Sequence, residues 1–171
     1  EAVKSGKLRQ IASGFMYDDG FEDTTVSHLD MARADATVGW FNTTPIGTRM
    51  VVFYEFVEHK RTLQALARHQ ATEDIDEFMK RDGPDILLAQ VNSLSHGVDG
   101  LQHVCSDILF YHPMWSRDAT EQAIGRVWRT GQTKPVNVTT LVCENTLDDL
   151  VMERVEDRGA WMKLFMQHLQ N

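Results

Sequence analysis

The sequence predicts an α/β fold in which a mainly parallel sheet is covered by helices on both faces. Short runs of residues that favour strands alternate with longer stretches in which apolar residues recur at helical spacing. Strands that alternate with helices imply right-handed crossovers, and such crossovers produce parallel sheets. The 171 residues suffice for one domain with its own core. Strands are expected at residues 50–54, 85–91, 108–111 and 136–142.

Two helices are expected before the first strand. One extends from Val3 to Ala12 and ends before Gly14, and the other extends from Leu29 to Phe41. Residues 18–26 between them are polar and rich in turn formers, and residues 43–47 form another turn. Apolar spacing in the second helix predicts four core-facing residues: Met31, Ala34, Val38 and Phe41.

The strand at residues 50–54 is apolar throughout, which is typical of a parallel strand buried on both faces. A helix from Glu58 to His69 follows it. The next helix is expected from Thr72 to Arg81, because Thr72 suits an N-cap and acidic residues occupy the first turn. The last helix begins at Thr146, with Asp149 as its capping partner.

The composition limits the functions that the chain can have. The formal net charge of −8 argues against binding nucleic acid by bulk electrostatics alone, although a local basic groove is compatible with it. No apolar run has the length of a membrane span, so no membrane partner is expected. Cys105 and Cys143 lack metal-ligand spacing and are expected to be small core residues in a reducing cytosol. No metal site is expected within the chain.

The stretch from Glu121 to Val138 carries the clearest chemical pattern. Gln122, Arg126 and Arg129 occur at i, i+4 and i+7, so on one helix they point the same way. Gly131 suits the position that follows a helix end. Two guanidinium groups beside an amide suit a polyphosphate. The alternative interpretation is a solvated helix face with two arginines that bind no ligand. The opposite side of the helix can face a core through Ala123, Ile124 and Val127.

Residues 122–132, Gln-Ala-Ile-Gly-Arg-Val-Trp-Arg-Thr-Gly-Gln, closely resemble motif VI of superfamily 2 helicases in the form found in Swi/Snf-type DNA translocases. The resemblance implies the C-terminal, or second, RecA-like lobe in a small bacterial or phage form, with a three-layer sandwich fold. The lobe would cover residues 1–171, with a linker segment at 1–28 and a C-terminal helical segment at 146–171. In that family ATP binds between two lobes, and these arginines reach a nucleotide held mainly by the other lobe.

Residues 93–102, Ser-Leu-Ser-His-Gly-Val-Asp-Gly-Leu-Gln, resemble motif V of the same family. Glycines let a backbone approach a ligand closely, so Gly97 and Gly100 are candidate nucleotide-binding residues. Asp99 is a candidate acceptor for a ribose hydroxyl. The alternative is a glycine-containing turn with a structural aspartate. Gly100 is one residue more than the Swi/Snf pattern contains.

The same loop is expected to contact the DNA backbone. Small hydroxyls and exposed amides suit phosphate oxygens, and the candidates are Ser93, Ser95 and His96. Both motifs follow predicted strands, and ligands of such sheets bind at the carboxyl ends of the strands. We therefore expect both motifs at that edge.

The parts of an ATPase site that hold phosphates and metal do not occur in the sequence. A phosphate-binding loop reads Gly-x-x-x-x-Gly-Lys-Ser/Thr, but Leu8 follows the only Gly-Lys step, at residues 6–7. Asp76 and Glu77 lie in a helical pattern and not at a strand end. ATP with Mg²⁺ is therefore expected to be held mainly by an N-terminal RecA-like lobe of the same protein.

The resemblance implies the second motor lobe of an ATP-dependent DNA helicase or translocase, acting on double-stranded DNA in a bacterial or phage-infected cytoplasm. Arg126 and Arg129 would be arginine fingers and Gln122 an orienting residue. This chain alone is expected to be inactive and to be a piece of a longer protein. The alternative is a non-catalytic DNA-binding or protein-interaction module that retains the helicase fold. A Rossmann enzyme is disfavoured because no Gly-x-Gly-x-x-Gly turn occurs.

Overall fold

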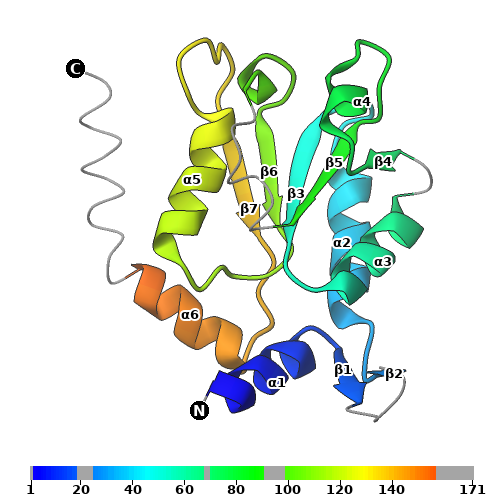
Figure 1. The fold of residues 1–171 in the computed structure, drawn as a ribbon, viewed down its shortest axis with the longest axis vertical. Coiled ribbons are helices and arrows are strands. Elements are labelled where there is room, and N and C mark those ends of the chain that lie inside the picture. The colour runs from blue at the N-terminus through cyan, green and yellow to red at the C-terminus, as the bar shows by residue number, and fades with distance from the viewer. Residues whose placement is uncertain (1, 19–24, 68–69, 91–98, 157–171) are drawn as a thin grey trace.

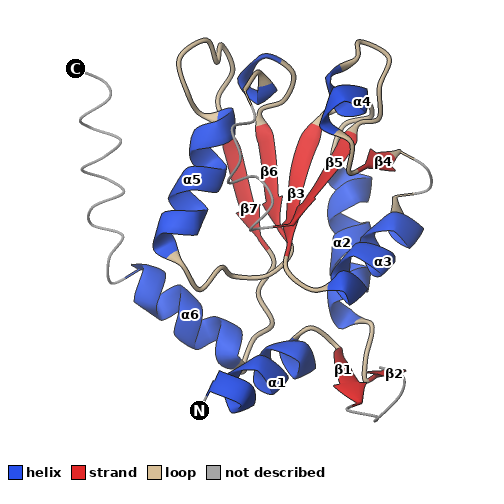
Figure 2. Cartoon of the chain, in the orientation of Figure 1, coloured by secondary structure: helices blue, strands red, loops and turns tan. Residues whose placement is uncertain are grey.

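The computed structural model of the chain describes residues 2–18, 25–67, 70–90 and 99–156. A five-stranded sheet lies between helices, and a small hairpin and two helices pack at one end (Figures 1 and 2). The helices are α1 (Ala2–Ala12), α2 (Ala32–Thr43), α3 (Val57–Leu66), α4 (Ile75–Met79), the 3₁₀ helix η2 (Leu101–His103), α5 (Arg117–Val127) and α6 (Leu147–Glu156). The strands are β1 (Phe15–Asp18), β2 (Thr25–His28), β3 (Met50–Tyr54), β4 (Ala71–Thr72), β5 (Ile86–Gln90), β6 (Asp107–Phe110) and β7 (Asn137–Thr140).

The large sheet has the strand order β4-β5-β3-β6-β7, and all of its neighbouring strands are parallel. β3 lies at the centre and is buried along its whole length, as its unbroken apolar run predicts. Helices cover both faces, which confirms the predicted α/β class. None of the described helices combines the length and the hydrophobicity that a membrane crossing requires.

Alternate residues of β3 point to different layers of the core. Val51 and Phe53 pack with residues of α4, η2 and α5, including Phe78, Leu101 and Val127. Met50 and Val52 pack on the other face with Leu63 of α3 and the aromatic side chains of α2. The helix that carries motif VI therefore lies on one face of the sheet and α2 and α3 lie on the other. At about 25 cal/mol per Å², burial of such side chains is the main stabilising contribution.

Residues 15–28 contain structure where the sequence predicted only a polar, turn-rich segment at 18–26. β1 and β2 form an antiparallel hairpin there, with Phe15 opposite His28. Ser27 Oγ donates to Asp18 Oδ2 at 2.6 Å, and Tyr17 N donates to Gln10 Oε1 of α1 at 3.0 Å. Each strand has only four residues and depends on cross-strand and helix contacts, so the sequence gave no clear strand pattern.

The buried face of α2 also differs from the prediction. Ala34 is buried as expected, but Met31 and Val38 are 54% and 38% exposed. Arg33 and Thr37 are buried instead, at 7% and 0% exposure. The helix is rotated toward Arg33 because this arginine has buried hydrogen-bond partners, which spacing of apolar residues cannot reveal.

The helix predicted from Thr72 to Arg81 is shorter, and Thr72 is not its N-cap. Thr72 lies in edge strand β4 opposite Leu87, and its Oγ1 accepts from Asp74 N at 3.0 Å. Asp74 is the N-cap of α4, where its carboxylate accepts from Glu77 N at 3.0 Å. Pairing with β5 therefore displaces the helix start by two residues.

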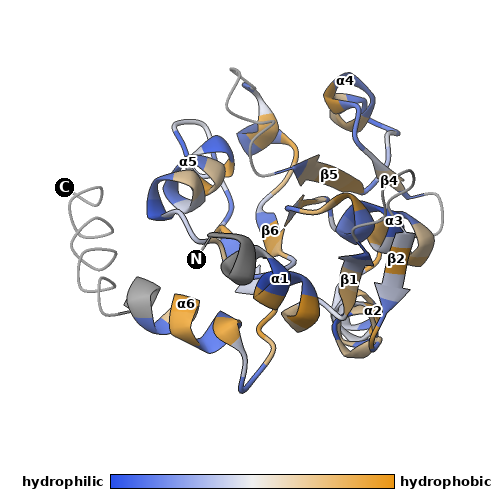
Figure 3. Cartoon of the chain, turned by 60° about the horizontal axis from the view of Figure 1, so that its bottom comes forward, coloured by the Kyte–Doolittle hydropathy of each residue, from blue (hydrophilic) through white to orange (hydrophobic). Residues whose placement is uncertain are grey.

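Arg33 connects four segments at the carboxyl edge of the sheet. Its Nη1 donates to Tyr111 O at 2.7 Å and to Leu141 O at 3.0 Å. Its Nη2 donates to Ala12 O at 3.0 Å and to the Asp148 carboxylate at 2.5 Å. The strand ends, α1 and α6 are thus joined through one guanidinium. Figure 3 brings this end of the molecule forward and shows hydrophobic residues on both of these helices.

The start of α6 nearly matches its prediction. Thr146 Oγ1 accepts from Asp148 N at 3.1 Å, as expected of an N-cap. The Asp149 carboxylate was expected to accept from the backbone N–H of Thr146. It accepts from Asn145 N instead, at 2.5 Å. Asn145 has a positive φ of 60°, which turns its amide toward that carboxylate.

Two buried histidines lie beside the Arg33 network. His112 is 6% exposed, and its ring centroid is 5.2 Å from that of His59. Burial lowers the pKa of His112 to about 4, and burial lowers the pKa of His59 well below its ordinary value. Both rings are therefore neutral at pH 7, and neither imidazole adds charge to this edge.

His112 is expected to make the fold sensitive to acid. Its folded pKa lies below its unfolded value, so the unfolded chain binds the extra proton and stability is lost as pH falls from about 6.5 to about 4. Between pH 7 and pH 4, urea unfolding of the wild type should lose about 3 kcal/mol more than that of His112→Leu. Parallel pH profiles for the two proteins would contradict this account of His112.

Candidate functional site

Helix α5 carries Gln122 and Arg126 of motif VI and packs its predicted apolar face on the sheet. Ser116 caps the helix, with its Oγ accepting from Ala119 N at 3.2 Å. Ala123 and Val127 are buried against the sheet at 6% and 0% exposure. Gln122 is exposed and Arg126 is half-buried. The predicted core face of this helix is confirmed.

Arg129 does not lie on the helix, contrary to the i, i+7 prediction. α5 ends at Val127, and Trp128 follows with φ −97° and ψ 86°, outside the helical region. Arg129 lies in the bend that follows, and its side chain is 44% exposed. Gly131 has a φ of 100° and lies in this turn, so it is not the residue directly after the helix end.

Gln132 explains where the helix stops. Its side-chain amide donates to Val127 O at 3.3 Å and to Cys105 O at 2.9 Å, and its oxygen accepts from Lys134 N at 2.9 Å. One side chain thereby binds a carbonyl of the last helical turn and the segment that leads into β6. Sequence reasoning assigned Gln132 no role of its own, although it ends the motif.

Gly131 is needed beside this contact. A Cβ atom at Gly131 would lie 2.7 Å from Cε1 of His103, and the positive φ also disfavours other residues. The turn after α5 therefore packs directly against the end of η2. Motif VI, through Gly131, and the residue that follows motif V, His103, therefore meet at this point.

The arginines lie at the amino edge of the sheet, so the expectation of the carboxyl edge is wrong for them. α5 starts after the carboxyl end of β6 and runs back across the sheet, and its 11 residues span about 16 Å. The segment after α5 contacts Cys105, two residues before β6 begins. At the same edge Asn137 Nδ2 donates to Asp107 Oδ1 at 3.0 Å, between the first residues of β7 and β6. Figure 1 shows these loops together at the top of the sheet.

The described part of motif V reaches the same edge. Asp99 Oδ1 lies 3.0 Å from Arg129 Nη1. The same oxygen accepts from Gly100 N at 2.9 Å and from the Gln102 side chain at 3.3 Å. The hydrogen bond from Gln102, the one from Gly100 and the charge of Arg129 lower the pKa of Asp99, in that order. Asp99 is therefore ionised at neutral pH.

Gly100 adopts a left-handed conformation with a φ of 101° and precedes η2 directly. Its conformation turns the chain so that Leu101 enters the core while Asp99 stays at the surface. The other motif V candidates, Ser93, Ser95, His96 and Gly97, lie outside the described residues. The structure thus brings Asp99 and Arg129 together.

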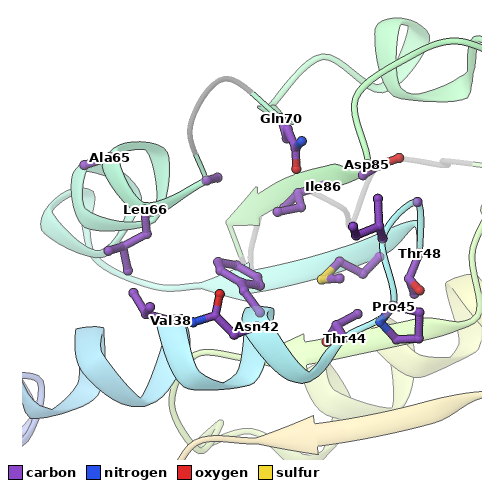
Figure 4. Close-up of a pocket in the computed structure, with 15 residues that line it drawn as sticks. Val38, Asn42, Thr44, Pro45, Thr48, Ala65, Leu66, Gln70, Asp85 and Ile86 are labelled. Carbon is purple, nitrogen blue, oxygen red and sulfur yellow. The ribbon is translucent and has the colours of Figure 1, made fainter.

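Two other features of the described residues do not add to this site. No group of three or more His, Cys, Asp or Glu residues among them is placed to hold a metal ion. A cavity of about 600 Å³ opens between α2, α3 and the starts of β3 and β5 (Figure 4). It is lined by residues such as Asn42, Thr48, Leu66 and Asp85, and none of the predicted site residues borders it.

Comparisons with known proteins support the resemblance read from the motifs. The chain is 26% identical over 179 residues to protein p41 of Acyrthosiphon pisum secondary endosymbiont phage 1, covering 99% of this chain and 38% of that protein. It is 31% identical over 87 residues to the chromatin-remodeling ATPase INO80 of Candida albicans, covering 50% of this chain and 6% of that protein. No family model matches the chain.

The fold has a solved counterpart. The crystal structure of the C-terminal part of the Fun30 ATPase domain matches 72% of this chain and 45% of that chain, with a TM-score of 0.62 and 18% identity. The chain spans well under half the length of p41 and a small part of INO80. In sequence the chain is similar to Swi/Snf-type ATPases such as INO80, and in fold it is similar to the C-terminal part of the Fun30 ATPase domain.

Proposed function

We propose that the chain is the second motor lobe of an ATP-dependent DNA translocase or helicase. The observation that carries the proposal is the meeting of motif V and motif VI at one edge, where Asp99 lies 3.0 Å from Arg129. Homology to Swi/Snf-type ATPases supports nucleotide use by the longer protein. The lack of a phosphate-binding loop in the sequence supports a site that is shared with an N-terminal lobe.

The residues at the amino edge fit the phosphate end of a nucleotide and do not fit its metal. Arg129 is 44% exposed on a turn, so its guanidinium can reach a ligand outside this lobe. ATP bound with Mg²⁺ in the other lobe would supply the phosphoryl group that is transferred to water. Arg129 would donate hydrogen bonds to γ-phosphate oxygens and stabilise the charge that develops there. Arg126 would add a second positive charge, and Gln122 would orient the phosphate, the water or the partner lobe.

The connection between β5 and η2 suits a role in coupling to DNA. Gln90 ends β5 at the carboxyl edge, and Asp99 lies beside Arg129 at the amino edge. These two described residues therefore lie at opposite edges of the sheet, and motif V lies between them in the sequence. We propose that Ser93, Ser95 and His96 in this segment contact the DNA backbone. Opening and closing of the cleft between this lobe and the proposed N-terminal lobe would then move this lobe along double-stranded DNA.

The test compares ATP hydrolysis by this chain with that by the full-length protein, each with and without double-stranded DNA. We expect no turnover by the chain alone and DNA-stimulated turnover by the full-length protein. Turnover by the chain alone would require a nucleotide site other than the proposed shared one. Inactivity of both would favour a non-catalytic DNA-binding or protein-interaction module.

A further inference from the structure

We infer that Asp99 is a positioning residue that holds the Arg129 guanidinium at the amino edge of the sheet, where the nucleotide is proposed to bind, and that Asp99 does not bind ribose. The inference rests on the proposed function, because it assigns Arg129 a part in ATP hydrolysis. Asp99 lies next to Gly100, the residue that motif V of this chain has in addition to the Swi/Snf pattern.

Arg129 needs a contact that fixes its side chain. It follows the end of α5, so the helix does not set its direction. The side chain is 44% exposed and long, and an arginine side chain of this kind samples many rotamers when it has no partner. Within the described residues, the charged group in contact with it is Asp99, at 3.0 Å from Nη1.

The Asp99 carboxylate is itself fixed by a hydrogen bond from a buried side chain. Gln102 is 7% exposed, and its side-chain amide donates to Asp99 Oδ1 at 3.3 Å. Its oxygen also accepts from Gly100 N at 3.1 Å, the same amide that bonds to Asp99 at 2.9 Å. Contacts therefore extend from buried Gln102 through Asp99 to exposed Arg129. A change in motif V would be transmitted directly to the motif VI arginine.

The ion pair leaves Arg129 able to bind phosphate. It uses the Nη1 nitrogen, whereas a guanidinium carries five N–H donors in a planar fork. The other donors can face a γ-phosphate while Asp99 keeps its contact. Oδ1 already receives donors from Gly100, Gln102 and Arg129, so this oxygen is engaged with the loop and the arginine. With Arg129 at the γ-phosphate, as proposed, its partner carboxylate lies at the end of the nucleotide opposite the ribose.

Asp99 could either orient Arg129 toward the nucleotide or keep it away from the nucleotide, and the exposure of the ion pair decides between these two roles. The two side chains are 44% and 72% exposed, and ion pairs of this kind change an equilibrium by about 5-fold at most. Such a contact orients a flexible side chain. It is too weak to keep a guanidinium from a polyphosphate, to which several charge-assisted hydrogen bonds would form.

The experiment replaces Asp99 in the full-length protein and measures DNA-stimulated hydrolysis of ATP and of 2′-deoxy-ATP. Asp99→Asn should lower kcat about 2- to 5-fold with an unchanged KM for both nucleotides, and Asp99→Glu should recover part of the loss. Asp82→Asn is the matched control, because it removes the same charge from an exposed turn just before β5. Melting temperatures of all three variants should match that of the wild type.

Three results would overturn the inference. A raised kcat in Asp99→Asn would mean that Asp99 withholds Arg129. A raised KM for ATP, with less discrimination against 2′-deoxy-ATP, would mean that Asp99 binds ribose. Kinetics equal to those of Asp82→Asn would mean that it has no part. If Arg129→Ala is inactive in the same assay, these failures leave the proposed function standing; if Arg129→Ala is fully active, the proposed function itself fails.

Discussion

Replacing Arg129 by alanine in the full-length protein is expected to reduce DNA-stimulated ATP hydrolysis by about 10³- to 10⁵-fold. This loss corresponds to about 4–7 kcal/mol of transition-state stabilisation. The reason is that a guanidinium stabilises charge on the transferred phosphoryl group, and no other side chain can replace its fork. Affinity for ATP should change little, because the other lobe is proposed to hold most of the nucleotide. The measurement is steady-state turnover beside equilibrium nucleotide binding.

Two further variants make the Arg129 result specific. Arg81→Ala removes an exposed arginine close to β5 but outside both motifs, and its turnover should equal that of the wild type. Arg126→Ala should also reduce turnover, and we expect a smaller loss because Arg126 is half-buried on α5. A wild-type rate in Arg129→Ala would refute the arginine-finger role, and a larger loss in Arg126→Ala would exchange the two roles.

Replacing Arg33 by methionine is expected to lower the free energy of unfolding of this chain by about 3–5 kcal/mol. The substitution leaves the buried Asp148 carboxylate without its charged partner, which lies 2.5 Å away in the wild type, and within the described residues that oxygen keeps only the Cys143 N–H as a donor. It also removes donors from the carbonyl groups of Ala12, Tyr111 and Leu141. Urea unfolding of this chain at pH 7 gives the difference through the transition midpoint.

Arg61→Met is the matched control for Arg33. Arg61 also forms an ion pair, with Glu58 at 3.2 Å, but its side chain is 65% exposed. The Arg61 guanidinium is hydrated in the folded protein, and the Glu58 carboxylate, although 9% exposed, keeps a contact with His28 Nε2 at 3.3 Å, so the expected loss is below about 1 kcal/mol. A similarly small loss in Arg33→Met would show that water reaches the Asp148 carboxylate in the folded protein.

The central strand and the motif VI helix could be predicted because their patterns are local. The unbroken apolar run of β3 requires burial on both faces, and the spacing of Ala123 and Val127 selects the core face of α5. Motif VI likewise needs few residues to be recognised. These features depend on neighbours within a few positions of the chain, so no tertiary information was needed.

The candidate site was predictable as a set of residues but not as an arrangement. Helical spacing placed Arg129 on α5, but the contacts of Gln132 with Val127 and Cys105 accompany an earlier helix end. Position after a strand predicted the carboxyl edge, but the crossover helix carries the arginines back to the amino edge. The pairing of Asp99 with Arg129 likewise joins two loops that the sequence separates by about thirty residues.

The sequence by itself determined the α/β class, the buried central strand and the resemblance to Swi/Snf-type ATPases, because hydrophobic periodicity and short motifs are written in consecutive residues. Only the tertiary structure decided the β1–β2 hairpin, the amino-edge position of Arg129 and the network of Arg33. Each of these depends on polar contacts between distant segments, as in Arg33 and Asp148, which are 115 residues apart. A buried polar group requires a partner, but its own sequence neighbourhood does not say which one.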